Sequence, residues 1–365
     1  MYIEHLSLYN FRNYTRLELD LKPGLNLFLG DNAQGKTNLL EACYLLATAR
    51  SHRTSRDLEM IKWEEREFYL AATLQTRHGT ETLQMHFEPS QGKKVRLDGI
   101  LQPRLSDLIG HLKVVFFAPE HLLLVKGEPG QRRRFLDILL SSLNRLYLYA
   151  LSNYNRTLRE KSILLKEEKV DTDLLRVYNQ QLAENGATLL HRRLQAIDQL
   201  AILAETCHFQ LESSEKLSIS YDSRLHADSS MSIESLREAL ERLYTQKEEE
   251  EIRRRIPLFG PHRDDLTILL GGEEARRFAS QGQQRSIVLS LKIAEARFIE
   301  KISDERPVLV LDDLFSELDP SRQGKLLDQL TSFGQTMISA TYLTPLLYQS
   351  EKSIYQIQQG TVTQK

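Results

Sequence analysis

A chain of 365 residues, 41% of them apolar, is long enough to bury a large core and suggests two compact lobes. Its 48 basic and 50 acidic residues nearly cancel, which excludes a positive field over the whole molecule, so any DNA-binding surface must be local. Only two cysteines occur, neither resembling a metal ligand, and no apolar run approaches the roughly 18 residues of a membrane span. We therefore expect a cytoplasmic protein without membrane contact.

The first fifty residues predict two strands, a glycine loop and a helix. Residues 17–21 alternate leucine with acidic side chains, as in a half-buried strand, and a Lys-Pro-Gly turn follows at 22–24. Residues 25–29 form the next predicted strand. Apolar residues then recur at helical spacing after Thr37, at Leu39, Leu40, Cys43, Leu46 and Ala47.

The middle of the chain changes from strands to helices. Residues 70–101 predict an antiparallel meander with turns at His78-Gly79 and Asp98-Gly99, whereas residues 131–255 predict helices apart from a strand at 217–221. The charged run 247–255 is expected to be a solvated helix face. Strands resume at 266–270 and 308–311, so we expect the two ends of the chain to share one sheet, with the helical lobe inserted between them.

A glycine-rich loop lies between the predicted strand 25–29 and the helix after it, as a phosphate-binding loop requires. Its glycines let the backbone N–H groups point at phosphate oxygens beside the helix N-terminus. The lysine would reach the β and γ phosphates of ATP, and the threonine hydroxyl would bind Mg²⁺. A plain glycine turn is the alternative, which the flanking elements disfavour. The loop consists of Gly30, Asp31, Asn32, Ala33, Gln34, Gly35, Lys36 and Thr37.

The strand at 308–311 lacks alternation, as a fully buried strand does, and it ends in two aspartates. We expect Asp312 to hold Mg²⁺, directly or through water, and Asp313 to accept a proton from the attacking water. The alternative is that both aspartates cap the next helix. A phosphate loop needs an acidic partner, however, and no other strand offers one.

Two further motifs flank this acidic strand. Upstream, Ser280 and Gly282 open a predicted helix together with Gln283, and a serine and a glycine at a helix N-terminus favour anion binding. That helix has an apolar face of Ile287, Leu291, Ala294 and Phe298. Downstream, residues 316–320 form an acidic turn that leads into a helix at Ser321.

In this order, the phosphate loop, the signature at 280–285, the acidic strand and the acidic turn resemble the ABC-type ATPases. The resemblance implies an α/β ATPase head, with a phosphate-loop sheet and an antiparallel flank. It also implies that Ser280, Gly282 and Gln283 of one subunit close on the γ phosphate held by the phosphate loop of another. ATP would then link a homodimer.

The distance between the phosphate loop and the signature indicates which branch of the ABC-type ATPases the chain resembles. About 240 residues separate Thr37 from Ser280, too many for a transporter subunit and too few for the coiled-coil arms of the SMC and Rad50 branch. The chain resembles the RecF family through strings that span most of its length, including residues 10–14, 124–137 and 260–265. This implies an ATPase lobe of residues 1–122 and 286–365 and a mainly helical lobe of residues 123–285, without a long coiled coil.

The resemblance to the RecF family also implies a function in DNA replication and recombinational repair. It implies ATP and Mg²⁺ as cofactors, an ATP-dependent homodimer that binds duplex DNA near single-strand gaps, and RecR and RecO as partners in loading RecA. Hydrolysis should be slow and DNA-dependent, since Asp313 stands where most ABC-type ATPases carry a longer glutamate. Thr341 replaces a switch histidine and would donate its hydroxyl to the γ phosphate. Arg12, in an early turn, would contact the nucleotide.

Duplex binding without sequence preference needs lysine and arginine side chains that neutralise phosphates. Arg50 and Arg53 lie just past the first helix, close in sequence to the phosphate loop, and Arg132, Arg133, Arg134 and Arg263 lie in the helical lobe. Further basic residues occur at 192–193 and 253–255. The alternative for each cluster is pairing with acidic neighbours on a helix.

Two other functional classes stay open at this point. One is an ATPase subunit coupled to a transporter or an assembly factor, although the chain lacks the short signature spacing and a membrane-coupling surface. The other is a kinase-like phosphoryl transferase, which would leave the signature at 280–285 unexplained.

Overall fold

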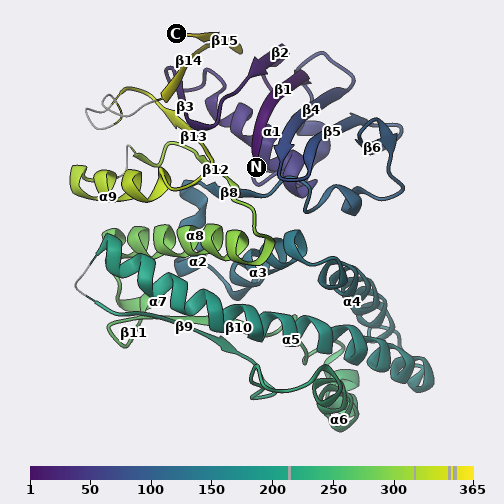
Figure 1. Ribbon diagram of the computed structural model, residues 1–365. Helices are drawn as coiled ribbons and strands as arrows, with labels where there is room; N and C mark the ends of the chain where they lie inside the picture. The colour runs from purple at the N-terminus through teal and green to yellow at the C-terminus, as the bar shows by residue number, and fades with distance from the viewer. Residues whose placement is uncertain (213–214, 316–317, 344–346, 348–351) are drawn as a thin grey trace. The chain divides into compact units, whose positions relative to one another are not determined.

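The computed structural model describes residues 1–212, 215–315, 318–343, 347 and 352–365 of the chain (Figure 1). It divides into two compact units, one formed by Met1–His121 with Lys292–Lys365 and one formed by Leu122–Leu291. We call these the two-sheet unit and the helical unit. The boundary expected after residue 122 falls after residue 121, and the boundary expected after residue 285 falls after residue 291, inside a helix.

The first sheet of the two-sheet unit is antiparallel, with strand order β2-β1-β4-β5-β6-β7. The predicted meander is confirmed as β4 to β7, and its two turns contain Gly79 and Gly99, both at positive φ. Burial alternates along β4, as expected for a strand with one face in the core. The strands are β1 (Tyr2–Phe11), β2 (Tyr14–Asp20), β4 (Phe68–Thr76), β5 (Gly79–Glu88), β6 (Gly92–Leu97) and β7 (Ile100–Leu101).

The second sheet has the order β15-β14-β3-β13-β12-β8, and it is parallel from β14 to β8. All four residues of β12 are buried, which explains why its sequence lacks alternation. Because β3 pairs with strands from the other end of the chain, the expectation that the two ends share a sheet is confirmed. The strands are β3 (Gly24–Leu29), β8 (Val114–Phe117), β12 (Val308–Leu311), β13 (Gln335–Ala340), β14 (Lys352–Gln358) and β15 (Thr361–Gln364).

Helix α1 (Lys36–Thr48) packs between the two sheets, against β8 and β13 on one side and β4 and β5 on the other. Ten of its 13 residues are buried, as a helix covered on two faces requires. One hydrophobic cluster contains residues of α1 and of both sheets, so the helix that follows the phosphate loop lies in the centre of the core. The unit also contains the short helix η1 (Asp57–Met60), η2 (Leu105–Leu108) and α9 (Pro320–Leu330).

The helical unit contains most of the remaining helices and a small antiparallel sheet of order β11-β10-β9. Its longest helix has 40 residues, so the described part of the chain contains no extended coiled coil. The elements are α2 (Leu123–Lys126), α3 (Pro129–Leu143), α4 (Arg145–Leu164), α5 (Thr172–Leu211), β9 (Leu217–Asp222), α6 (Ile233–Arg254), β10 (Asp265–Leu270), β11 (Glu273–Glu274) and α7 (Ala275–Phe278); η3 (Pro119–Leu122) and α8 (Gln281–Ser303) contain the unit boundaries.

Two expectations for this part of the chain are wrong. Strand 266–270 does not join the sheet shared by the chain ends; as β10, it pairs with β9 and β11, and its alternating burial suits a half-exposed antiparallel strand. The run 247–255 is not wholly solvated, because Glu251 is fully buried. Glu251 lies on the same face of α6 as the buried residues Leu236, Leu240 and Tyr244.

No helix among the described residues is both long enough and apolar enough to cross a membrane.

Candidate nucleotide-binding site

The loop that joins β3 to α1 lies at the carboxyl end of parallel strands, where open α/β sheets bind their ligands. Two of its residues, Ala33 and Gly35, have positive φ of 64° and 117°. Such a succession of conformations turns neighbouring N–H groups toward one side and forms an anion-binding concavity. The predicted strand, loop and helix are therefore present in the expected order.

The two glycines of the loop are required by close neighbours. A Cβ atom on Gly30 would lie 2.3 Å from the carbonyl oxygen of Ile357 in the adjacent strand β14. A Cβ atom on Gly35 would lie 2.6 Å from Nδ2 of Asn13. Any larger residue at either position would push the loop away from the elements that support it.

Gln34 fixes the loop on two sides. Its carbonyl oxygen accepts hydrogen bonds from Nδ2 of Asn13 at 3.0 Å and from the backbone N–H of Gly360 at 3.1 Å. Its side-chain oxygen accepts from the N–H of Gln359 at 2.7 Å. The turn at Asn10–Tyr14 and the turn between β14 and β15 therefore hold the loop together. Sequence reasoning missed these supports, because both come from segments distant from the loop in the chain.

Lys36 is buried, and its ammonium group donates to the carbonyl oxygens of Gly30 at 2.6 Å and Asp31 at 2.8 Å. Burial lowers the pKa of Lys36, while the nearby charges of Asp313, Asp312 and Asp31 raise it. No ion pair joins Lys36 to a carboxylate among the described residues. The site thus holds a buried cation whose contacts are neutral, as suits a site for a bound anion.

Asp312 and Thr37 meet at the end of the second sheet. The Thr37 hydroxyl donates to Oδ1 of Asp312 at 3.0 Å, and Ser339, at the end of β13, donates to the same oxygen at 2.7 Å. Burial raises the pKa of Asp312, and these two hydrogen bonds lower it. Two oxygen ligands placed this close suit Mg²⁺. Within the described residues no group of three His, Cys, Asp or Glu side chains is placed to hold a metal. Mg²⁺ in phosphate-binding sites generally has one or two protein ligands and keeps phosphate oxygens and water as the others.

Asp313 follows in a left-handed conformation, with φ of 49°, and its N–H donates to the Ser339 hydroxyl at 2.9 Å. The two aspartates do not cap α9. The N-cap of α9 is Asp319, whose side chain accepts from the N–H of Arg322 at 3.1 Å. The expected acidic turn includes Ser316 and Glu317, which lie outside the described residues.

The signature residues lie in the helical unit, at the N-terminus of α8. The side chain of Gln283 accepts from the Ser280 N–H at 2.7 Å, and the Ser280 hydroxyl accepts from the Gln283 N–H at 3.3 Å, which forms a capping box. Gly282 lies in the first turn. Ser280 is exposed, as is the nearby Phe278 at 67%. The predicted apolar face of this helix is confirmed, since all four of its residues are buried.

Two other expected nucleotide contacts are placed as follows. Thr341 directly follows β13 and is half-buried. Arg12 binds both carboxylate oxygens of the buried Glu41, at 2.7 and 3.0 Å, and the carbonyl oxygen of Glu59 at 2.7 Å. In this structure the Arg12 guanidinium therefore supports α1 and η1.

The arginines predicted to bind DNA differ in the exposure of their guanidinium groups to solvent. Arg132 is only 5% exposed and makes a two-pronged ion pair with Asp265, with both distances 2.7 Å, so burial removes it as a free phosphate-binding cation. Arg193, at 2% exposure, is excluded for the same reason, since it pairs with Asp137. Both pairs join residues too distant in sequence to be foreseen.

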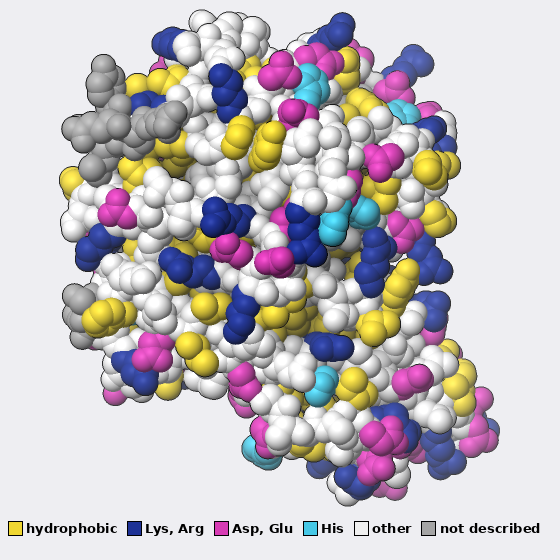
Figure 2. All heavy atoms as spheres, viewed as in Figure 1, with side chains coloured by type: hydrophobic (Ala, Val, Ile, Leu, Met, Phe, Trp, Pro, Cys, Tyr) yellow, Lys and Arg dark blue, Asp and Glu magenta, His cyan; other side chains and the backbone are white. Residues whose placement is uncertain are grey.

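The other arginines are more open to solvent. Arg133 donates to the carbonyl oxygen of Asp264 and Arg263 to that of Pro257, while Arg53 contacts Asn38 and, at 3.5 Å, Glu41. Arg50 and Arg134 are exposed. On the face shown in Figure 2, Lys and Arg side chains are interspersed with Asp and Glu, in keeping with the balanced composition.

The fold and the site together define an ABC-type ATPase head, with a phosphate loop, an acidic strand beside it and a signature helix. The family model for the RecF/RecN/SMC N-terminal domain matches residues 2–363. A solved Smc head bound to the C-winged helix domain of ScpA shares the fold, with a TM-score of 0.58 at 13% identity over 100% of this chain and 97% of that one.

Within this class, the chain belongs to the RecF family of DNA replication and repair proteins. It is 42% identical to RecF of Symbiobacterium thermophilum over 367 residues, which cover 99% of this chain and 98% of the relative. It is 41% identical to RecF of Streptococcus pneumoniae over 364 residues, with coverage of 99% and 98%. The resemblance drawn from the motifs is confirmed.

Solved structures of RecF give the same result. The recombination mediator protein RecF of the RecFOR pathway, described with ATP and with ATPrS, matches this chain with a TM-score of 0.92 and 32% identity in both forms. The match covers 100% of this chain and 99% and 98% of the two solved chains. The predicted fold class, an α/β ATPase head with a mainly helical second part, is confirmed.

Proposed function

We propose that this protein binds ATP with Mg²⁺ at the phosphate loop, dimerises on the bound nucleotide, and acts as a DNA-binding clamp in replication and recombinational repair. The observation that carries the proposal is the convergence of three groups from two distant parts of the chain, the phosphate loop and the end of β12. These are the Lys36 ammonium, the Thr37 hydroxyl and the Asp312 carboxylate. The RecF structures described with ATP support the same ligand.

Each residue of the site has a separate task in this proposal. The backbone N–H groups from Gly30 to Gly35 and the Lys36 ammonium bind phosphate oxygens, and Thr37 and Asp312 supply oxygen ligands for Mg²⁺. When bound, the metal would neutralise charge on the transferred phosphoryl group. Asp313 orients the attacking water and accepts its proton. Hydrolysis is slow, because an aspartate reaches less far than a glutamate.

The helical unit supplies the second half of the site from another subunit. Ser280, Gly282 and Gln283 are at a helix N-terminus, where the partial positive charge favours a phosphate. Phe278 beside them is a large apolar side chain in water, which fits a surface that becomes covered in the dimer. Thr341 and Arg12 complete the nucleotide contacts. In this scheme, the two-sheet unit holds ATP and the helical unit presents the signature.

Dimerisation is the first test. With ATP and Mg²⁺, multi-angle light scattering should show the mass of a dimer, and without nucleotide that of a monomer. Ser280→Arg should abolish the dimer and leave ATP binding by calorimetry unchanged, whereas Asp313→Asn should prolong the dimer by slowing hydrolysis. A Ser280→Arg variant that still dimerises with ATP would refute the role of the signature.

DNA binding is proposed to be local and independent of sequence, with Arg50, Arg53, Arg134 and Arg263 as the phosphate contacts and Arg133 beside them. Duplexes near single-strand gaps are the proposed target, and RecR and RecO the partners that join the protein in loading RecA. The names of the relatives support a role in DNA replication and repair, and the RecFOR pathway named for the solved RecF structures supports RecR and RecO as partners. Arg132 is not among these contacts, because its guanidinium is buried and paired with Asp265.

The ATPase rate with and without gapped duplex DNA tests the nucleotide chemistry and the partner class together. We expect a slow basal rate that gapped duplex increases. The DNA affinity should fall steeply with added salt, since each phosphate contact releases counterions. Equal rates with and without DNA, together with a flat salt response, would exclude a DNA-dependent ATPase.

A further inference from the structure

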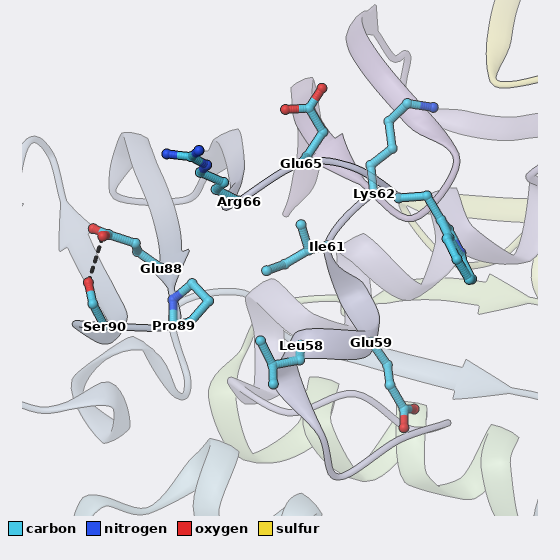
Figure 3. Close-up of a pocket in the computed structure, with 10 residues that line it drawn as sticks. Leu58, Glu59, Ile61, Lys62, Glu65, Arg66, Glu88, Pro89 and Ser90 are labelled. Atoms are coloured by element: carbon cyan, nitrogen blue, oxygen red, sulfur yellow. Dashed lines mark hydrogen bonds between the residues drawn. The ribbon is translucent and has the colours of Figure 1, made fainter.

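A buried hydroxyl at the end of β13 contacts both acidic residues of the proposed ATP site. Ser339 is fully buried and belongs to the strand that lies between β12 and β3, which lead to the aspartates and to the phosphate loop. The open pocket of about 730 Å³ beside η1 is a separate feature of the same unit, because neither Ser339 nor Asp312 nor Asp313 lines it (Figure 3). Ser339 therefore belongs to the nucleotide-binding edge of the second sheet.

The strand register brings this hydroxyl to the site. Leu311, the last residue of β12, pairs with Ile338 of β13. The next residues along these strands, Asp312 and Ser339, are therefore level with each other. On its other side β13 pairs with β3, where Ser339 is opposite Phe28 near the end of the strand. Because both pairings are parallel, the carboxyl ends of the three strands meet at one edge, and a polar residue at this position of β13 can reach groups from both neighbours.

Ser339 helps to determine which oxygen of the Asp312 carboxylate is left for a ligand. Its hydroxyl donates to Oδ1 at 2.7 Å, the Thr37 hydroxyl donates to the same oxygen at 3.0 Å, and among the described residues no hydrogen bond reaches Oδ2. Thr37 is itself an expected Mg²⁺ ligand, so Ser339 is the donor whose one task is to orient the carboxylate. The loss of such a hydrogen bond to a metal-binding side chain typically costs about 10- to 100-fold in metal affinity or activity.

The same hydroxyl supports the backbone at Asp313. That residue has φ of 49°, a left-handed conformation that residues other than glycine rarely adopt, and its N–H donates to Oγ of Ser339 at 2.9 Å. Such a conformation persists where the surrounding structure holds it. Because a backbone N–H can only donate, Oγ must accept this bond, and its single hydrogen is directed at the Asp312 carboxylate. One hydroxyl therefore holds both acidic residues at once.

We propose that Ser339 is a positioning residue for Mg²⁺-dependent ATP hydrolysis, which turns Oδ2 of Asp312 toward the metal site and holds the backbone turn that presents Asp313 to the attacking water. The inference rests on the proposed function, because Ser339 acts through the two aspartates. Ser339→Ala removes the donor to one aspartate and the acceptor for the other, without adding bulk at a buried position. The phosphate loop should still bind ATP, since no hydrogen bond joins the Ser339 hydroxyl to the described loop.

Calorimetry with the full-length protein compares ATP binding in Mg²⁺ with ATP binding in EDTA. In Ser339→Ala, the gain in affinity that Mg²⁺ provides should shrink about tenfold or vanish, whereas the affinity in EDTA should stay within about twofold of that of the unchanged protein. At ATP and Mg²⁺ concentrations that saturate both proteins, the rate of hydrolysis should also fall about tenfold or more, because the turn at Asp313 is no longer held. A hydroxyl that only stabilises the strand would not change the Mg²⁺ gain selectively.

Thr336→Val is the matched control. It removes a hydroxyl from a buried residue of the same strand, and Thr336 has no hydrogen bond with either aspartate in the described part of the chain. Its Mg²⁺ gain and its rate of hydrolysis should equal those of the unchanged protein. Ser339→Thr keeps the hydroxyl and should stay within about threefold of the unchanged protein in both quantities. Urea unfolding establishes that each variant is folded before the comparison.

The positioning role is overturned if Ser339→Ala has the Mg²⁺ gain and the hydrolysis rate of Thr336→Val, or if it loses ATP affinity equally in EDTA and in Mg²⁺. It is also overturned if Ser339→Thr is as impaired as Ser339→Ala, since the hydroxyl is then not the group that matters. Failure of the proposed function is read from the unchanged protein alone. Absence of ATP binding, or ATP binding without any gain from Mg²⁺, would refute the proposed site and the role of Ser339 with it.

Discussion

The two units of the protein each bury a lysine, and they treat its charge in opposite ways. In the two-sheet unit, the hydrogen bonds of Lys36 to described residues all go to backbone carbonyl oxygens at the start of the phosphate loop. In the helical unit, Lys161 is fully buried, lies 2.6 Å from the carboxylate of Glu251 and stands over the ring of Tyr244. Burial lowers the pKa of both lysines.

The partner of each buried lysine distinguishes a ligand-binding site from a structural core. A buried cation that has a carboxylate beside it is neutralised by the protein itself, whereas one that has only carbonyl oxygens can still gain from a bound anion. The same distinction applies to Arg193, whose contacts with Asp137, two tyrosine hydroxyls and the Pro261 carbonyl use its donors within the unit. Buried charge alone does not indicate function, and its partner must be known.

The largest effect that this comparison predicts is on stability. Lys161→Met removes one partner of a buried pair and leaves the Glu251 carboxylate, among the described residues, with the N–H of Leu258 as its one hydrogen-bond donor. Breaking such a pair costs about 3–5 kcal/mol, which should appear as a lower free energy of unfolding in urea at neutral pH.

A second substitution tests the cause of that loss. Glu251→Gln added to Lys161→Met keeps an acceptor for the Leu258 N–H and removes the unpaired charge. The double variant should regain roughly half of the lost stability or more. If it is no more stable than Lys161→Met, the loss comes from packing, and the contrast between the two lysines does not hold.

The second prediction concerns the other lysine. Lys36→Met should weaken ATP binding about 100-fold or more, which corresponds to roughly 3 kcal/mol, because it removes the charge that the loop presents to phosphate. The free energy of unfolding without nucleotide should change by only about 1–2 kcal/mol, because the loss of two bonds to backbone carbonyls is partly offset by removal of a buried charge. Calorimetry and urea unfolding measure the two quantities. A loss of stability as large as that of Lys161→Met would make Lys36 a structural residue.

The features that could be predicted from the sequence alone are those defined by residues close together in the chain. The phosphate loop and the capping box of Ser280 and Gln283 are local patterns, because the residues that define each are neighbours in the chain. The buried run of β12 was likewise recognisable from its composition. From the sequence alone, the loop and β12 predict the nucleotide site, and Ser280 with Gly282 at the start of a helix predicts the signature.

The contacts that the sequence did not reveal join residues that are far apart in the chain. Asn13 reaches Gln34 across 21 positions, Ser339 reaches Asp312 across 27, and Arg132 reaches Asp265 across 133. An arginine in a helix has the same pattern whether it is solvated or paired with a distant aspartate, so the sequence alone leaves Arg132 and Arg193 among the candidates for DNA binding. Strand β10 was placed in the wrong sheet for a related reason, since its pairing partner β9 lies beyond a helix of 22 residues.

A third prediction concerns the pH dependence of stability, because the helical unit buries the carboxylate of Asp264. Burial raises the pKa of Asp264 from 3.8 to about 6, although Tyr221 and Arg193 lower it. Between these values the folded protein binds more protons than the unfolded chain, so its stability falls as the pH rises through this range and is constant above it. The expected loss is roughly 3 kcal/mol.

Asp264→Asn removes this titration. The difference in free energy of unfolding between the unchanged protein and the variant should therefore shift in favour of the variant between about pH 4 and pH 6. Parallel stability curves over that range would show that Asp264 is ionised throughout, and that its hydrogen bonds with Tyr221 outweigh burial.

The smallest predicted effect concerns the support of the phosphate loop. Gly360 has φ of 75°, and a Cβ atom there would lie 2.8 Å from the carbonyl oxygen of Asn13. Gly24 has a similar φ of 81° and no atom within 4 Å of its Cβ position, which makes it a matched control. Alanine at either position costs about 1 kcal/mol for the left-handed backbone, but only Gly360→Ala forces the turn apart from Asn13.

Gly360→Ala should therefore weaken ATP binding by a factor of about 5 to 10, or roughly 1 kcal/mol, beyond any effect of Gly24→Ala. The reason is that Gly360 and Asn13 both hold the carbonyl of Gln34, so separating them loosens the loop around its phosphate-binding conformation. Equal ATP affinities in the two variants would mean that the loop keeps its shape without the turn between β14 and β15. The cation at Lys36 would then be positioned by α1 and β3 alone, and the anion site would be a property of the local sequence.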